Sequence, residues 1–374
     1  MVGDSMYRDT TVAVVIPAYN EEGFVGAVID DLPSFVDRAY VIDDGSTDDT
    51  WDEISTHSDA RNTTHDGHFD ELVVPIQHNK NRGVGGAIKT GYQRAREDGL
   101  EITAVLGGDD QMNPEVLTQY LDPIVDGVAE YTKGNRFAHP DDWEEMPRFR
   151  LIGNLMLSYI TKIASGYWAS MDSQNGYTAI SLDALERTDI EGMYEYYGYC
   201  NDLLVRLNAA DVRIADVPRS SEYAYTDGWK SHIDYKEYIP RVSGMLFRSF
   251  LWRLRRKYLI TSYDPIAPLY LLGIGVSSVS VLGLLRSLTS SDSDSGTWMV
   301  PTILGILTFL YATMRDRSDN SHLETQYDPE RGSEDADDPI AEERIESRQA
   351  ASDDPGTPAD SDGTQADGVI SMGS

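Results

Sequence analysis

Polar residues of ligand-binding types follow two short apolar segments near the N-terminus. Pro17-Ala-Tyr-Asn-Glu-Glu22 comes directly after residues 12–16, and Asp43-Asp-Gly-Ser-Thr-Asp48 comes after residues 40–42. Between them apolar side chains recur at helical spacing, and Asn20 is placed to cap the start of that helix. This order predicts a β-α-β unit, and ligands bind beyond the carboxyl ends of its parallel strands. Both clusters should therefore line one site, and their chemistry suits a nucleotide.

Glycines at the start of a later helix allow two interpretations. Residues 72–76 form the next predicted strand, and Gly83, Gly85 and Gly86 open the helix that follows its loop. Free backbone N–H groups and the positive end of the helix dipole would suit a pyrophosphate there. The same glycines would equally permit close packing of the helix on the sheet. Residues 102–106 add another strand, and this alternation indicates an α/β domain with a mostly parallel sheet.

The chain is strongly acidic. Its 374 residues include 63 Asp and Glu against 31 Lys and Arg, a formal charge of −32. Residues 315–374 hold 17 of the acidic and 5 of the basic side chains, so this segment alone does not explain the excess. An acidic, lysine-poor surface predicts a halophilic source, with an acidic face for a basic partner as the alternative. Either interpretation disfavours nucleic-acid binding. The single cysteine, Cys200, excludes an internal disulfide and a cysteine-based zinc site.

Two long uncharged segments match the thickness of a bilayer. Residues 266–285 have the length that a transmembrane helix needs, and residues 298–314 lie at its lower limit. They predict a transmembrane hairpin, with a pair of buried core helices as the alternative. Basic residues outside the pair predict that the body and the C-terminal tail are cytoplasmic. These residues are Arg248, Arg253, Arg255, Arg256 and Lys257 before the first span, and Arg315 and Arg317 after the second.

The remaining segments complete the expected domain organisation. An α/β domain should cover residues 1–235, followed by an amphipathic segment over 236–264 whose arginines meet lipid phosphates. The transmembrane hairpin should cover residues 265–314. Residues 315–374 are rich in Asp, Glu, Ser, Gly and Pro, which predicts a disordered acidic tail.

Four motifs stand in order at the predicted strand ends. They are Val15-Ile-Pro-Ala-Tyr-Asn-Glu21, Val41-Ile-Asp-Asp-Gly-Ser-Thr47, Asn81-Arg-Gly-Val-Gly-Gly86, and Asp109-Asp-Gln111 with Pro114. Together they resemble the inverting family 2 glycosyltransferases, and most closely the dolichyl-phosphate mannose or glucose synthases with two membrane spans. The resemblance covers about residues 12 to 234. It implies a GT-A domain, which is Rossmann-like with a mostly parallel central sheet.

The resemblance also implies where a nucleotide-sugar donor binds. The residues that would line the nucleoside pocket are Pro17, Ala18, Tyr19 and Glu21, with Asp44 on the base and Gly83 near the ribose or pyrophosphate. Asp109 and Gln111 would coordinate Mg²⁺ or Mn²⁺ against the donor's phosphates, and hard oxygen ligands suit these ions. The family commonly reads Asp-x-Asp-x-Gln, but Gly107 replaces the first aspartate. The ion should therefore bind more weakly or rely more on substrate oxygens. A solvated acidic turn is the alternative for Asp109.

Basic residues matching the family's phosphate contacts come later in the chain. Arg136 follows a predicted strand, and Arg148 and Arg150 lie in the expected acceptor loop. The rigid donor fork of arginine suits phosphate oxygens and offsets charge on a leaving group. Pairing with nearby acidic residues is the alternative for Arg148 and Arg150. Gly228-Trp-Lys-Ser231 resembles the family's Gly-x-Ser-Lys element with its last two residues exchanged, which makes Lys230 a further candidate.

Asp202 stands near the position where many GT-A enzymes keep a catalytic carboxylate, and Asp172-Ser-Gln-Asn-Gly-Tyr177 resembles the segment beneath the family's acceptor site. A phosphate acceptor is already largely ionised near neutral pH and needs little help from a base. Catalysis would then rest on positioning and on charge stabilisation through the metal at Asp109 and through Arg136. A hydroxyl acceptor would instead need Asp202 as its base.

These features predict transfer of a hexose, with inversion, from a UDP- or GDP-linked donor to polyprenyl or dolichyl phosphate. The reaction would take place at the cytoplasmic membrane face and supply cell-surface glycosylation, with a homo-oligomer left open. One alternative is a membrane glycosyltransferase that extends a lipid-linked saccharide. Another is a noncatalytic nucleotide-sugar-binding scaffold. A processive polysaccharide synthase is disfavoured, because the chain lacks a Gln-x-x-Arg-Trp element and two spans are too few for a channel.

Overall fold

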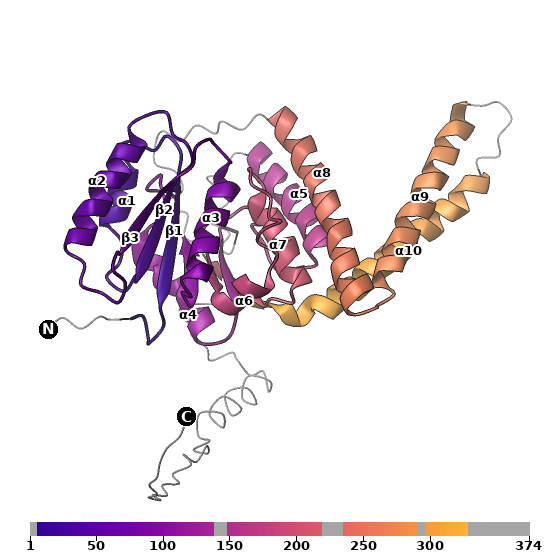
Figure 1. Ribbon diagram of the computed structural model, residues 1–374. Helices are drawn as coiled ribbons and strands as arrows, with labels where there is room; N and C mark the ends of the chain where they lie inside the picture. Colours follow the sequence, from indigo (N-terminus) through magenta and orange to yellow (C-terminus); the bar gives the residue numbers. More distant parts are fainter. Residues whose placement is uncertain (1–5, 138–147, 219–234, 290–295, 328–374) are drawn as a thin grey trace, which may run out of the picture. The chain divides into compact units, whose positions relative to one another are not determined.

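The computed structural model describes residues 6–137, 148–218, 235–289 and 296–327 (Figure 1). Eight strands form one sheet in the order β3-β2-β1-β4-β6-β5-β7-β8. The strands are β1 (Val12–Ala18), β2 (Arg38–Asp43), β3 (Val73–Gln77), β4 (Ile102–Val105), β5 (Tyr131–Asn135), β6 (Thr178–Ser181), β7 (Ile214–Pro218) and β8 (Glu324–Gln326). Only β6 runs antiparallel to its neighbours β4 and β5 among these strands. The mostly parallel α/β sheet predicted from the sequence is present.

Helices cover both faces of the sheet, and the alternation of side chains along each strand supplies an apolar surface to each face. In β1, Val12, Val14 and Ile16 pack in one core and Ala13 and Val15 in the other. The first core is covered by α1 (Val25–Asp30), α2 (Thr50–Thr63) and α4 (Leu117–Val125), next to the short η1 (Pro114–Val116). The second is covered by α3 (Val84–Glu97), α6 (Leu182–Arg187) and α7 (Tyr199–Ala209).

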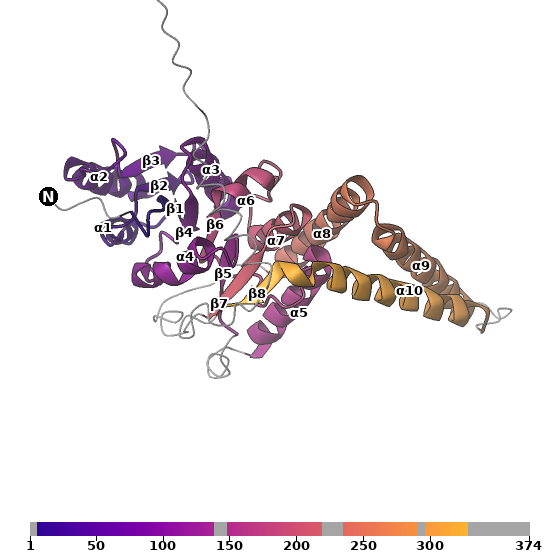
Figure 2. The same cartoon turned by 90° about the horizontal axis from the view of Figure 1, so that it is seen from below.

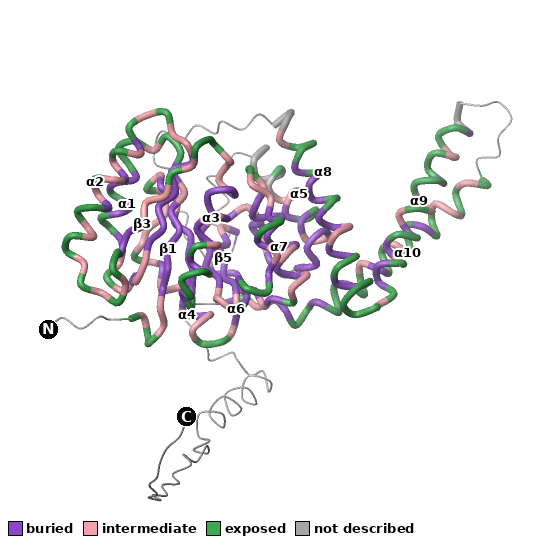
Figure 3. The backbone as a smooth tube through the Cα atoms, viewed as in Figure 1, coloured by how far each residue is buried: buried purple, intermediate pink, exposed green. Residues whose placement is uncertain are grey.

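Two further helices lead toward the apolar hairpin. A third core joins α5 (Arg148–Ser165), α7, α8 (Tyr235–Arg253) and the π-helical η4 (Leu254–Thr261) to the base of the hairpin. The hairpin consists of α9 (Ile266–Thr289) and α10 (Gly296–Asn320), so both helices are longer than the predicted spans. Both are long and apolar enough to cross a membrane, and much of their surface is exposed (Figure 3). A Cβ on Gly273 would lie 2.7 Å from Phe309 N, so small residues let the two backbones approach closely.

The chain returns to the sheet after the hairpin. A 3₁₀ turn, η5 (Ser321–Leu323), leads into β8, which pairs in parallel with β7 at the edge of the sheet (Figure 2). Leu323 is buried in the same core as β1 and α3. Regular structure thus extends past residue 315, where the tail is expected to begin, and β8 joins the sheet although it lies beyond residue 235, the expected end of the α/β domain. Main-chain pairing and one buried leucine hold this segment despite its acidic composition. Residues 328–374 lie outside the described part of the chain.

The basic residues before the hairpin divide into two groups. Arg248, Arg255 and Arg256 are exposed, as residues that meet lipid phosphates should be. Arg253, however, is 0% exposed and forms an ion pair with Asp316 of α10 at 2.7 Å. Lys257 is also buried, and its Nζ bonds to Asp211, to Asn208 and to Asn320. The prediction that the arginines meet lipid phosphates is wrong for Arg253, which pairs with a buried carboxylate inside the protein. Lys257 likewise satisfies acceptors inside the protein.

Candidate functional site

The carboxyl ends of β1, β2 and β4 lie together at one end of the strands, because β1 lies between β2 and β4 and runs parallel to both. The backbone after β1 contacts both neighbours. Asp44 N donates to Ala18 O at 2.8 Å, and Gly108 N donates to Pro17 O at 3.2 Å. Tyr19 follows on the same loop and is 44% exposed, so its ring is accessible to a ligand. The fold therefore brings the three polar loops of the predicted site together.

Asn20 does not cap a helix, because α1 begins only at Val25. Its side-chain oxygen instead accepts a hydrogen bond from Thr47 N at 2.9 Å, and its own N–H donates to Ser46 Oγ at 2.9 Å. The φ of Asn20 is 57°, in the left-handed region that asparagine tolerates better than most residues. The capping prediction is wrong. Asn20 ties the loop after β1 to the loop after β2.

Asp44 is 2% exposed, and its carboxylate has three partners. One oxygen pairs with His78 Nδ1 at 2.7 Å and accepts from Arg82 N at 2.9 Å, and the other accepts from Gly83 N at 2.7 Å. The carboxylate thus fixes the loop that precedes α3. The role of Asp44 on a nucleotide base stays a prediction, and the base would share an oxygen that is already bonded. The Gly83 N–H is likewise occupied by Asp44 rather than open to a pyrophosphate.

The glycines that open α3 pack against a turn at residues 194–196. A Cβ on Gly83 would lie 2.5 Å from Glu195 O, and one on Gly85 would meet the same turn. Gly86 N donates to Glu195 O at 2.9 Å. Close packing of these glycines is therefore present, and the pyrophosphate interpretation stays a prediction. The partner is this turn rather than the sheet, and a contact between segments so far apart in the sequence leaves no local signal.

Asp109 lies in an acidic corner with Glu21 and Asp48. Burial, followed by the charges of Asp109 and Asp48, raises the pKa of Glu21 to about 7. Burial, Glu21 and Asp109 also raise the pKa of Tyr197. The sequence did not single out Tyr197, whose only signal is its place in a run of tyrosines before α7. Negative charge gathered in a half-buried site favours the binding of a cation.

Gly107 leaves room for the carboxylate of Asp109. A Cβ at position 107 would lie 2.7 Å from Asp109 Oδ1, which also accepts from Gln111 N at 3.4 Å. Within the described ranges, no group of three or more His, Cys, Asp or Glu side chains could hold a metal. A hard cation beside Asp109 would thus take most of its ligands from substrate oxygens and water. Mg²⁺ is commonly bound in this way, so the residues present fit such an ion.

Arg136 follows β5, which β4 and β6 separate from β1 in the sheet, and the buried carboxylate of Asp172 holds its side chain. Asp172 accepts from Arg136 Nε and Nη2 at 2.7 Å each, and from its backbone N at 3.1 Å. Burial alone would raise the pKa of Asp172, but the Arg136 guanidinium more than offsets this and lowers that pKa to about 2. The pair stays ionised, and the bidentate contact fixes the plane of the guanidinium. The Arg136 side chain remains 25% exposed and can still meet an anion.

Three further predicted contacts lie outside the described side chains. Arg148 is the first residue of α5, and its side chain lies outside the described part of the structure, as does that of Arg150. Lys230 lies in the segment 219–234, also outside the described residues. All three stay predictions.

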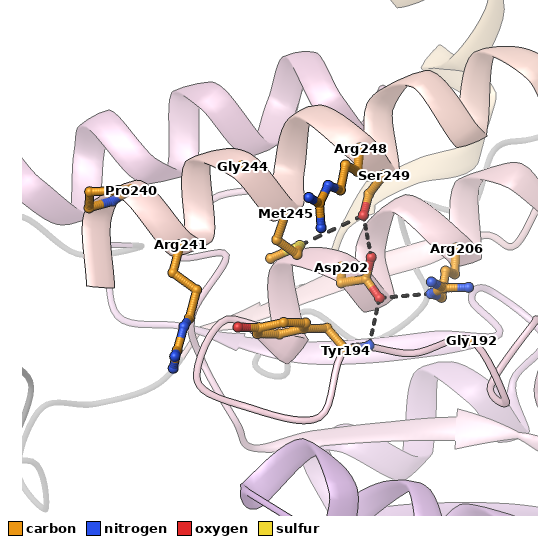
Figure 4. A pocket seen from close by; sticks show the side chains of 10 residues that line it. All are labelled: Gly192, Tyr194, Asp202, Arg206, Pro240, Arg241, Gly244, Met245, Arg248 and Ser249. Atoms are coloured by element: carbon orange, nitrogen blue, oxygen red, sulfur yellow. Dashed lines mark hydrogen bonds and ion pairs between the residues drawn. The ribbon is translucent and has the colours of Figure 1, made fainter. Parts of the chain in front are cut away.

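Asp202 lies on α7 beside a cavity of about 430 Å³ that α8 and the turn at residue 194 also line (Figure 4). Asp202 is 1% exposed. It accepts hydrogen bonds from Arg206 Nε at 2.7 Å, Tyr194 N at 2.8 Å and Ser249 Oγ at 2.5 Å. None of these partners belongs to the acidic corner around Asp109. The contacts suit a carboxylate that holds α7, α8 and the turn together, and its role as a base stays a prediction.

Comparison with known proteins decides the family. The model of glycosyl transferase family 2 matches residues 13–188. A UDP-N-acetylglucosamine–dolichyl-phosphate N-acetylglucosaminyltransferase from Methanococcus voltae is 32% identical over 235 residues, which cover 61% of this chain and 93% of that protein. The chain belongs to glycosyltransferase family 2. The expected GT-A fold is confirmed by this family match together with the mixed α/β sheet.

Other similar proteins share the same stretch of this family 2 glycosyltransferase. A dolichyl-phosphate hexose transferase from Haloferax volcanii is 27% identical over 213 residues, which cover 57% of this chain and 83% of the relative. Among solved structures, glucosyl-3-phosphoglycerate synthase from Mycobacterium tuberculosis is 18% identical with a TM-score of 0.46. That alignment covers 66% of this chain and 80% of the other.

Asp202→Asn should separate a structural role from a catalytic one in this glycosyltransferase. We expect turnover to fall less than about tenfold, because the substitution keeps the size of the side chain, while the melting temperature falls as a buried charge partner of Arg206 is lost. Asp189→Asn is the matched control, because Asp189 bonds the same arginine at 2.6 Å but is 43% exposed. Near-complete loss of turnover at an unchanged melting temperature would instead identify Asp202 as the base for a hydroxyl acceptor.

Cys200 should report on folding. It is the single cysteine of the chain and is 8% exposed, and burial raises the pKa of its thiol to about 11. Because the thiolate is the reactive form, we expect a maleimide to label the folded protein at pH 7 at least about 100-fold more slowly than the unfolded protein. Intact-mass measurement of the adduct with and without denaturant checks this. Complete labelling of the native protein within minutes would contradict the described packing of α7.

Proposed function

We propose that this glycosyltransferase transfers a sugar, most simply a hexose, from a UDP- or GDP-linked donor to a polyprenyl or dolichyl phosphate in the membrane. The observation that carries the proposal is the acidic corner at the ends of β1 and β4, in a domain that continues into two membrane-length apolar helices. Its relatives from Methanococcus voltae and Haloferax volcanii, both named for dolichyl phosphate, support this acceptor class.

Donor binding would use the residues gathered at the three strand ends. Tyr19 and the loop after β1 would contact the nucleoside, and Asp109 with Gln111 would hold Mg²⁺ or Mn²⁺. When bound, such an ion offsets the charge that develops on a departing nucleoside diphosphate. Burial raises the pKa of Glu21 most, and the charges of Asp109 and Asp48 raise it further, which supports a cation at this corner. Among the described residues no group of three His, Cys, Asp or Glu side chains could hold a metal, so the ion would take its remaining ligands from the diphosphate and water.

Acceptor binding would use Arg136, oriented by Asp172. An acceptor phosphate carries its own negative charge near neutral pH, so it can attack the anomeric carbon without a protein base. The full hydrogen bonding of Asp202 favours this over a mechanism that needs Asp202 to take a proton. A single displacement of this kind inverts the anomeric configuration.

The membrane arrangement that we propose has α9 and α10 spanning the bilayer, with the catalytic domain on the cytoplasmic side. The exposed Arg248, Arg255 and Arg256 before the hairpin support this orientation. A protease-protection experiment on sealed vesicles checks it, because a cytoplasmic domain is digested in inverted vesicles only.

Membranes that contain the full chain provide the test of the reaction. They are incubated with labelled UDP- or GDP-sugars, UDP-N-acetylglucosamine included, and with dolichyl phosphate, dolichol or a lipid-linked saccharide as acceptor. We expect an organic-soluble product with one donor, with dolichyl phosphate only, and only with Mg²⁺ or Mn²⁺ present. Product formed on a lipid-linked saccharide instead would favour the elongating transferase. No product with any donor and acceptor would favour a noncatalytic scaffold.

A further inference from the structure

The loop between α5 and β6 is held by a carboxylate from β8, the strand that follows the hairpin. Glu324 accepts hydrogen bonds from three consecutive backbone N–H groups, those of Trp168 at 2.6 Å, Ala169 at 2.7 Å and Ser170 at 2.8 Å. Consecutive N–H groups that converge in this way form an anion-binding nest. In this protein a side chain of the same chain fills the nest.

A second buried carboxylate continues the attachment along the loop. Asp216 of β7 accepts from Ser170 Oγ at 2.9 Å and from Met171 N at 2.7 Å, and it pairs with Lys133 Nζ at 2.9 Å. Lys133 Nζ also donates to Met171 O. Carboxylates of β7 and β8 thus accept hydrogen bonds from the backbone N–H groups of all four residues from 168 to 171.

The next residue of the loop is Asp172, which holds Arg136 through two side-chain nitrogens and its backbone N–H. Glu324 is therefore linked to Arg136 by hydrogen bonds at each end of a short stretch of chain. It bonds to the backbone of Ser170, and Asp172, two residues later, bonds to Arg136. A displaced backbone at residues 168–171 would shift Asp172 and rotate the guanidinium that it holds. Small displacements matter here, because errors of about 1 Å in a positioning group can cost 100-fold in rate.

At its other end, β8 is tied to the hairpin. Only the three residues of η5 separate it from α10, and α10 is locked to the domain through the buried pair of Asp316 and Arg253. Burial raises the pKa of Glu324 above its ordinary value, and its hydrogen bonds from Ser170, Trp168 and Ala169 offset only part of that rise. Three charge-assisted hydrogen bonds from residues 168–170 thus fix the position of the Glu324 carboxylate.

We propose that Glu324 is a positioning residue that couples the end of the membrane hairpin to Arg136, the acceptor-side arginine. This inference rests on the proposed function. It implies that the short strand after the hairpin belongs to the acceptor site, although it touches no substrate. It also gives a reason for the chain to return from the membrane to the edge of the sheet.

The kinetic test compares Glu324→Ala, Glu324→Gln and the control Gln326→Ala, which changes an exposed residue on the same strand. We expect Glu324→Ala to raise the KM for dolichyl phosphate about tenfold while the donor KM changes less than about twofold. Glu324→Gln keeps one acceptor oxygen and should recover part of the acceptor KM. Equal changes in both KM values, or no recovery with Gln, would overturn the proposal. Slow Cys200 labelling verifies that each variant is folded.

The second measurement does not depend on activity. Hydrogen exchange of the full chain in detergent should accelerate at residues 168–171 and at the Arg136 amide in Glu324→Ala, but not in Gln326→Ala. Acceleration confined to residues 168–170 would mean that the contact is only a local clamp, and would overturn the coupling. If the wild type makes no product on any lipid phosphate, the proposed function fails, while the exchange result still decides the coupling.

Discussion

Asp109→Asn is expected to lower kcat by at least about 100-fold, the scale on which a charge-stabilising group in an active site acts. Asparagine keeps the size of the side chain and can still accept from Gln111 N, but it removes the negative charge that attracts the cation. The loss should therefore reside in metal binding rather than folding. Turnover measured against Mn²⁺ concentration checks this, and the variant should need much more metal and not regain full rate.

Asp110→Asn is the matched control for this prediction. Asp110 is adjacent and exposed, and its φ of 55° lies in the left-handed region, which asparagine adopts readily. We expect its kcat to stay within about twofold of the wild type, as for surface substitutions generally. If the two variants lost activity equally, the corner would act through its overall charge, and Asp109 would not be a specific ligand.

Asp316→Ala should produce the largest loss of stability, about 3 to 5 kcal/mol, the usual cost of removing one partner of a buried ion pair. Both residues of the pair are 0% exposed, and Arg253 bonds to both carboxylate oxygens at 3.0 and 2.7 Å. The hydroxyls of Tyr258 and Tyr270 donate to the same carboxylate. Removing it leaves the guanidinium and these hydroxyls without their acceptor.

The loss of stability in Asp316→Ala is measured from the rate of Cys200 labelling during a denaturant titration. Asp319→Asn, an exposed residue of the same helix, should leave the midpoint unchanged. The double variant Arg253→Met with Asp316→Leu should recover much of the stability, because apolar pairs of similar volume often replace buried ion pairs without cost. A midpoint unchanged in Asp316→Ala would show that the hairpin is not anchored to the domain through this pair.

The strand ends of this site were predictable because their signals are local. The segment 12–16 has the apolar run of a buried parallel strand. The polar residues that follow it are therefore predicted to lie at the end of a strand, independently of the rest of the sequence. The placement of Asp109 beside the loop after β1 is implied by the resemblance to family 2 glycosyltransferases, because the pairing of β4 with β1 leaves no local signal.

The features that the sequence missed depend on partners far along the chain. β8 has three residues in an acidic segment, so neither its length nor its composition marks it as a strand. The basic sequence neighbours of Arg253 favour a lipid contact, whereas its partner, Asp316, lies near the end of α10, 63 residues further along the chain. Tyr197 approaches the acidic corner only because the turn beside it packs on the glycines of α3.

The measurement that tests the central claim most directly is the coupling between bound Mn²⁺ and the phosphorus atoms of the nucleoside diphosphate. We expect electron–nuclear double resonance of the purified enzyme with Mn²⁺ and UDP or GDP to show ³¹P hyperfine coupling in the wild type and in Asp110→Asn. The coupled species should largely disappear in Asp109→Asn. Equal ³¹P coupling in Asp109→Asn would contradict the assignment of Asp109 as the residue that holds the metal against the donor.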